Sequence, residues 1–209
     1  MLITCPECEL QISDKALVCP HCGFPLKKNA QVYPRKANKR RRLPNGFGQN
    51  LDITLIQFYS GWRPNELLSM KLEDVDLENK TFHGGSKTVA GKNRIVPIHS
   101  KIFHFVEQHY NEAVAAGSEY VFQSDTQPGK AYTYDRYYVR LIEARDALGL
   151  DKSHRPHDGR VQFATMAKKA KMDQYALKKI LGHYIDDVTE KYYIKPGMDW
   201  LRNEIEKIK

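Results

Sequence analysis

The chain has 209 residues, which is enough for one full domain and a small module but short for two large domains. Its 33 lysines and arginines outnumber 25 acidic residues, and the formal net charge of +8 favours a polyanionic partner, although a basic surface alone does not require one. The sequence shows neither an apolar run of roughly 20 residues, as a membrane span needs, nor a secretory signal pattern. We therefore expect a soluble, cytoplasmic protein.

All four cysteines lie within the first 22 residues, in two Cys-x-x-Cys pairs. They are Cys5, Cys8, Cys19 and Cys22. Each pair can form a tight turn that aims two thiolates at one ion, so two pairs complete a tetrahedral zinc shell; a redox dithiol or disulfides are the alternatives. Residues 3–26 resemble a zinc ribbon, which implies one structural zinc ion; His21 could replace a cysteine, but four thiolates already fill the shell. This short segment has too little apolar content to fold without the metal. We therefore expect zinc binding and folding to be one event.

Residues 27–49 are predicted to form a basic linker. They contain the charge run Lys39-Arg40-Arg41-Arg42 and the turn-forming sequence PNGFG at 44–48, and both features argue against a packed element. The linker would serve either as a solvated tether or as a basic strap on nucleic-acid phosphates. A charge run of this kind supplies affinity without information about base sequence.

From Leu51 onward the sequence has the pattern of a globular domain. Apolar residues predict a buried helix that ends at Gly61, and then a helix with Pro64 in its first turn. Strand-like segments near 75–82 and 94–98 predict a small antiparallel sheet. Further helices are expected at about 101–116, 133–149, 160–171, 173–181 and 198–208. The predicted organisation is a zinc ribbon at 1–26, the linker at 27–49, and a mainly α domain with a small antiparallel β-sheet at 50–209.

Two patterns in the first part of this domain contain candidate catalytic cations. The sequence YSGWRPNEL at 59–67 places Arg63 at the start of a helix, where an arginine could simply pair with a carboxylate such as Glu66. The sequence GGSKT at 84–88 leads to KNRIVPI at 92–98, and this hairpin carries Lys87 and Lys92 near its tip. A lysine at a hairpin tip is by default only solvated.

Two more patterns follow in the second part of the domain. The sequence HRPHDGR at 154–160 precedes an amphipathic helix and contains two histidine and two arginine candidates. The sequence LGH at 181–183 is followed by VTEKYYIK at 188–195, which places tyrosines nine and ten positions after the histidine. A single tyrosine among the 12 in the chain would be presumed structural.

These four patterns, in this order, resemble the catalytic domain of the tyrosine recombinase (phage integrase) family. The resemblance implies six catalytic residues: Arg63, Lys87, His157, Arg160, His183 and Tyr193. Alternatives stay open at the same segments, namely Lys92, His154, Arg155 and Tyr192. Gly159 and Ile194 differ from the residues that the family usually has there. His154 and Arg155 lie before Pro156, where extended chain is favoured over helix.

The chemistry of strand cleavage agrees with these residue types. Guanidinium groups at Arg63 and Arg160 would stabilise negative charge on the phosphate oxygens without a metal ion or ATP. A tyrosine hydroxyl, with a pKa of about 10, needs a proton acceptor, for which His157 is the candidate. Lys87 would protonate the departing deoxyribose oxygen, while His183 would hydrogen-bond the phosphate or orient the tyrosine. The product would be a 3′-phosphotyrosyl bond to DNA.

The resemblance implies double-stranded DNA as the partner and a homotetramer on paired sites, as in an integrase of a phage or other mobile element. Relatives usually place a core-binding domain before the catalytic domain, whereas the ribbon and linker occupy that place here. The alternatives are a truncated, non-catalytic DNA-binding relative or regulator, and a zinc-ribbon module that docks a partner protein. A type IB topoisomerase shares the chemistry, but the short chain disfavours it.

Overall fold

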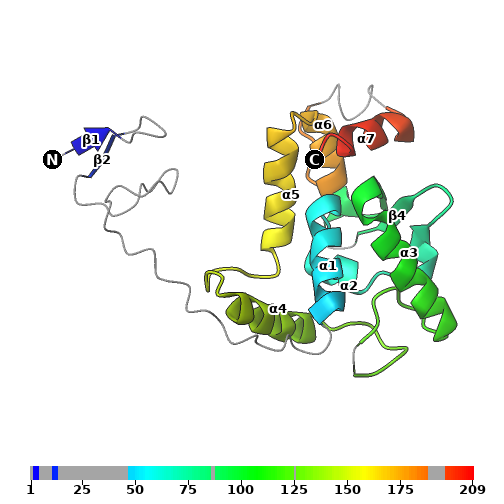
Figure 1. Cartoon of the computed structure of the whole chain (residues 1–209). Helices are drawn as coiled ribbons and strands as arrows, with labels where there is room; N and C mark the ends of the chain where they lie inside the picture. Colours follow the sequence, from blue (N-terminus) through cyan, green and yellow to red (C-terminus); the bar gives the residue numbers. More distant parts are fainter. Residues whose placement is uncertain (1, 5–10, 14–46, 86–87, 125, 188–195) are drawn as a thin grey trace. The chain divides into compact units, whose positions relative to one another are not determined.

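The computed structural model describes residues 2–4, 11–13, 47–85, 88–124, 126–187 and 196–209, with the backbone alone at 2, 12 and 47–50 (Figure 1). The chain divides into two compact units, Met1–Arg42 and Leu43–Lys209. Several residues of the sequence analysis lie outside the described residues: Cys5, Cys8, Cys19, Cys22, Lys87, Tyr192 and Tyr193. Of the linker predicted at 27–49, residues 27–46 lie outside them as well, whereas residues 47–49 are helical and so belong to the following domain.

The first unit contains one described β-hairpin. Strand β1 (Leu2–Thr4) pairs antiparallel with β2 (Gln11–Ser13), and Thr4 lies opposite Gln11. Residues 5–10 join the two strands, and this connection contains the first Cys-x-x-Cys pair.

The second unit begins with two helices that meet at a sharp turn. Helix α1 (Phe47–Ser60) starts ahead of Leu51, where the apolar pattern begins, and α2 (Pro64–Leu68) starts with the proline, as predicted. Gly61 ends α1 with a φ of +69°, a left-handed conformation that side chains disfavour. A Cβ atom at Gly61 would also lie 2.6 Å from the ring of Phe163. The glycine therefore fixes how closely α1 approaches the helix that carries Phe163.

A small antiparallel sheet follows, as the sequence predicts. Its strands are β3 (Val75–Asp76), β4 (Thr81–Gly84) and β5 (Arg94–Pro97), in the order β3-β4-β5. Gly84 lies opposite Arg94 at the end of the β4–β5 hairpin that adjoins its connection, residues 85–93. Within the connection, Thr88 Oγ1 accepts a hydrogen bond from the Gly91 amide at 3.2 Å, which caps the 3₁₀ turn Val89–Gly91.

Among the described residues of the unit, five more helices follow, close to the positions that the sequence predicts. They are α3 (Ser100–Ala115), α4 (Tyr134–Leu148), α5 (Asp158–Lys169), α6 (Gln174–Leu181) and α7 (Met198–Ile205). Asp173 caps α6 by accepting hydrogen bonds from the amides of Tyr175 and Ala176, and Gly182 ends it in the left-handed region. None of the described helices is both long and apolar enough to cross a membrane.

The core of the second unit forms around α1, which lies between α5 and α3 (Figure 1). Large aromatic side chains from four segments are fully buried in it: Trp62, Phe82, Phe122 and Phe163. Trp62 and Phe82 form a T-shaped pair with 6.2 Å between their ring centroids, an arrangement that aromatic pairs favour. The core thus connects the α1–α2 turn, the sheet and α5, which are the segments that carry the candidate cations.

Buried His99 precedes α3 and is held in one protonation state. Its Nδ1 accepts a hydrogen bond from the Lys101 amide at 3.0 Å, and its Nε2 lies 2.8 Å from the carbonyl oxygen of Ile208. Because an amide can only donate and a carbonyl can only accept, the ring is neutral with its proton on Nε2. Burial lowers the pKa of His99 below 6.5, against the opposing effects of the Ile208 carbonyl and Glu206.

We expect the free energy of unfolding to decrease as the pH falls below about 6.5. Because the folded pKa is lowered, the contribution of His99 is fully present above the unfolded pKa and is lost as the pH falls through the folded pKa. Urea unfolding at a series of pH values measures this slope. In His99→Gln the slope should be smaller but not zero, since burial also lowers the pKa of His109. An equal slope in the variant would show that His99 does not contribute.

Candidate active site

Arg63 lies at the turn before α2 and shares a carboxylate with a second arginine. Its Nη1 is 3.2 Å from Glu66 Oε1, while Glu66 Oε2 is 2.7 Å from Nη2 of Arg94. The Glu66 side chain is only 5% exposed. The pairing with Glu66 that the sequence left open for Arg63 is therefore present. It does not exclude anion binding, because a guanidinium has five N–H donors and the Arg63 side chain remains partly exposed.

Arg160 is a buried residue in the first turn of α5. Its Nη1 donates a hydrogen bond to the carbonyl of Gly61 at 2.6 Å, and its Nη2 donates to the carbonyl of Leu181. One guanidinium thus joins the end of α1 to the end of α6. Burial lowers its pKa to about 10, and the charges of Arg63 and Arg94 act in the same direction. Arg160 therefore remains a cation at neutral pH.

Two exposed histidines adjoin these arginines. His157 immediately precedes α5 and lines a hollow of about 490 Å³ together with Arg63 and Glu66. His183 follows the glycine that ends α6. Although His183 is exposed, partial burial of its ring lowers its pKa, and the nearby charge of Arg160 lowers it further, with smaller effects from Arg63 and Arg94. The neutral imidazole can then accept or donate a hydrogen bond near neutral pH.

The structure therefore brings four sequence-predicted residues together: Arg63, His157, Arg160 and His183. Lys87 and Tyr193, like the alternative Tyr192, lie outside the described residues. Among the described residues, the charges of Arg63, Arg94 and Glu66 act on Arg160. Three guanidinium groups, counting that of Arg160, therefore lie near one carboxylate. Positive charge is thus in excess and partly desolvated, as the stabilisation of a phosphate anion requires.

Arg94 is the member of this group that the sequence analysis did not identify. It begins β5, where Arg94 and Val96 are buried and Ile95 between them is exposed. The alternation places an arginine at an inward-facing position of a strand. A charged residue at such a position is unusual unless it is paired, and this was the signal available in the sequence.

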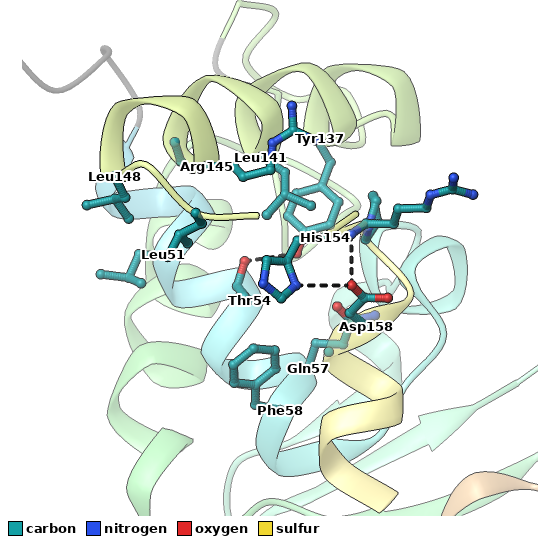
Figure 2. Close-up of a pocket in the computed structure, with 15 residues that line it drawn as sticks. Leu51, Thr54, Gln57, Phe58, Tyr137, Leu141, Arg145, Leu148, His154 and Asp158 are labelled. Atoms are coloured by element: carbon teal, nitrogen blue, oxygen red, sulfur yellow. Dashed lines mark hydrogen bonds and ion pairs between the residues drawn. The ribbon is translucent and has the colours of Figure 1, made fainter. Parts of the chain in front are cut away.

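The alternative residues before α5 take other positions. His154 Nδ1 lies 3.4 Å from Asp158 Oδ2, and the Arg155 amide donates to the same oxygen at 2.9 Å. Both residues line a mostly apolar cavity of about 270 Å³ between α1, α4 and the start of α5 (Figure 2). In this cavity the Thr54 hydroxyl lies 2.9 Å from that of Tyr137, and burial raises the pKa of Tyr137 to about 12. Among the four described catalytic candidates, none lines this cavity.

Residue 159 is a glycine, unlike the usual residue of the family, and the packing of α5 on α1 explains it. A Cβ atom at this position would collide with the side-chain amide of Gln57, which is buried in α1. Gln57 in turn donates a hydrogen bond to the carbonyl of Trp62 at 3.2 Å. The glycine therefore allows α5 to begin directly against α1, next to Arg160.

The fold and the cluster of cations define a mainly helical domain that can hold a phosphate-like anion. Residues 47–197 match the model of the Phage integrase family. The chain belongs to this family, which confirms the resemblance seen in the sequence.

Curated relatives carry the name tyrosine recombinase. XerA of Pyrococcus horikoshii is 31% identical over 161 residues, which cover 75% of this chain and 54% of that protein. XerA of Saccharolobus solfataricus is 31% identical over 145 residues, which cover 69% of this chain and 45% of that protein. The chain thus spans about half the length of these relatives.

Solved structures share the fold. The Tn1549 transposon integrase, solved in complex with circular intermediate DNA, matches with a TM-score of 0.59 and 22% identity, covering 78% of this chain and 59% of that one. The crystal structure of XerA recombinase matches with a TM-score of 0.53 and 20% identity, covering 77% of this chain and 62% of that one. These matches confirm the predicted fold of a mainly α domain with a small antiparallel sheet.

Proposed function

We propose that this protein is a site-specific recombinase or integrase that cleaves and rejoins DNA strands through a 3′-phosphotyrosyl intermediate. The observation that carries the proposal is the convergence of Arg63, Arg160 and His183 from three segments far apart in sequence. His157 faces the same region, since it lines a hollow with Arg63. The family membership and the DNA complex of the Tn1549 integrase support DNA as the substrate.

In the proposed reaction, the Tyr193 hydroxyl attacks a DNA phosphorus and its proton passes to His157. The bond from phosphorus to the 5′-oxygen breaks, and Lys87 protonates that oxygen as it leaves. Arg63 and Arg160 bind the non-bridging oxygens as charge develops on them, while His183 hydrogen-bonds the phosphate. A 5′-hydroxyl of a second strand then reverses the attack and restores Tyr193 without ATP or a metal ion.

The first unit is proposed to be a zinc ribbon with Cys5, Cys8, Cys19 and Cys22 as ligands. The antiparallel pairing of β1 with β2 supports this assignment, because the first cysteine pair lies in the connection between them. Zinc would have a structural role there, and the basic linker would contact DNA phosphates. A homotetramer on paired DNA sites is the proposed assembly, by analogy with the family.

A suicide-substrate assay tests the proposal directly. Nicked duplexes from the genomic flanks are incubated with the full chain, and covalent protein–DNA adducts are resolved on a denaturing gel. We expect an adduct that Tyr193→Phe abolishes and Tyr192→Phe retains, because only one phenol attacks phosphorus.

The two tyrosine variants serve as matched controls, since they make the same change at adjacent positions. Loss of the adduct in Tyr192→Phe alone would transfer the nucleophile to Tyr192. An absence of adduct on every flank, with DNA binding retained, would contradict strand exchange. The chain would then be a non-catalytic DNA-binding relative or regulator.

A further inference from the structure

Arg94 is buried in the second unit with each of its guanidinium nitrogens engaged. Nε donates to the carbonyl of Ile180 at 3.1 Å, Nη1 to the carbonyl of Gly91 at 3.0 Å, and Nη2 to Glu66 at 2.7 Å. The guanidinium carbon also lies 3.8 Å from the ring centroid of Trp62, within the range of a cation–π contact. The residue is 7% exposed, so it is not placed to touch DNA.

Three glycines make room for this side chain. A Cβ atom at Gly85 would collide with Nη1 of Arg94, and one at Gly91 would lie 3.3 Å from the same nitrogen. A Cβ at Gly182 would lie 3.2 Å from Cδ of Arg94 and 2.6 Å from Cα of Gly91. The backbone of the hairpin and the backbone at the end of α6 therefore lie directly against the Arg94 side chain, with no room for a Cβ atom between them.

The partners of Arg94 belong to the segments that carry proposed catalytic residues. Glu66 also binds Arg63. Ile180 lies near the end of α6, three residues before His183. Gly91 belongs to the connection that contains Lys87 in sequence, and Thr88 Oγ1 of that connection lies 3.4 Å from the Gly182 carbonyl.

We infer that Arg94 is a positioning residue, which holds Arg63, the β4–β5 connection at Gly91 and the end of α6 before His183 in register for strand cleavage without contacting DNA. This inference rests on the proposed function for the catalytic roles of those residues. A buried ion pair is a poor source of stability, because well-packed apolar side chains often serve as well or better. The fork geometry of a guanidinium, by contrast, can bind two carbonyls and a carboxylate at fixed angles, which neither an apolar side chain nor lysine can do.

The experiment compares Arg94→Met and Arg94→Lys with Val96→Ala in the full chain. Val96 is a fully buried residue two positions along the same strand, so its truncation lowers stability without touching the proposed contacts. Melting temperatures identify the loss of stability in each variant. Single-turnover adduct formation at saturating suicide substrate, DNA affinity, and hydrogen exchange of peptides covering residues 84–94 and 180–184 are then measured.

In Arg94→Met we expect adduct formation to slow about 100-fold, as misplacement of reacting groups can cause. DNA affinity should stay within about twofold of that of the unchanged protein, because Arg94 does not touch DNA. Exchange should rise in both peptides. Arg94→Lys keeps the charge but not the fork, so it should recover only part of the rate. Val96→Ala should be nearly as fast as the unchanged protein.

Three results would overturn the inference: equal rates in Arg94→Met and Val96→Ala at similar melting temperatures, full recovery in Arg94→Lys, or unchanged exchange at both peptides. If the unchanged protein forms no adduct with any DNA, the proposed function fails. The exchange measurement then decides alone whether Arg94 holds the hairpin to the end of α6, so the two failures are distinguishable.

Discussion

Arg160→Lys is expected to slow formation of the covalent protein–DNA adduct about 100- to 1000-fold, the range typical for loss of a transition-state hydrogen-bond donor. Lysine keeps a positive charge but lacks the fork that binds the Gly61 and Leu181 carbonyls. Its single ammonium group cannot hold both carbonyls and a phosphate oxygen in the same geometry. Single-turnover cleavage of a suicide substrate at saturating DNA measures the effect.

Arg155→Lys is the matched control, since it makes the same chemical change at an exposed arginine five residues earlier. It should cleave at close to the normal rate, because Arg155 lines the apolar cavity rather than the hollow that His157 shares with Arg63. Equal loss in the two variants would show only a general need for arginine on this segment. Normal cleavage by Arg160→Lys would remove Arg160 from the proposed mechanism.

The second large effect is expected at the N-terminal unit. The purified, reduced chain should contain one zinc ion, and Cys8→Ser should lose it, since three thiolates leave the tetrahedral shell incomplete. Structural zinc in small finger peptides contributes about 10–16 kcal/mol at neutral pH, so residues 1–26 should unfold when zinc is removed. Metal content by mass spectrometry and hydrogen exchange of peptides from residues 1–26 measure both changes.

His21→Asn separates the two possible ligand sets. If four thiolates bind the ion, this variant keeps one zinc ion per chain; if His21 replaces a cysteine, the variant loses it. The unfolding transition of the second unit serves as an internal reference in each case. A chain that is reduced, free of zinc and still protected from exchange at residues 1–26 would contradict the ribbon.

The Glu66 carboxylate shows how the site tolerates several cations in a small volume. It lies between Arg63 and Arg94, and it acts to raise the pKa of Arg160 where burial and the other guanidinium groups lower it. Without that carboxylate, the mutual repulsion of the arginines would be larger. The remaining positive charge is available for a phosphate.

Much of the second unit follows from local sequence patterns. The apolar run from Leu51 to Gly61 predicts α1, Pro64 marks the start of α2, and the two glycines at the end of β4 mark the hairpin. These features are local because helix periodicity, proline geometry and positive φ angles depend on neighbouring residues. Arg63 and Arg160 are likewise indicated by short strings of neighbouring residues, which gain their meaning from the order of the four family patterns.

What the sequence determined by itself is the class of the domain, its helices and hairpin, and the family to which it belongs. Only the tertiary structure decided that Arg94 joins the site and that Gly159 is required by Gln57. The physical reason is distance along the chain. Arg94 binds Ile180 across 86 positions, and Arg160 binds Gly61 across 99. Local periodicity shows which face of an element is buried, whereas contacts of this range form only when the elements pack together.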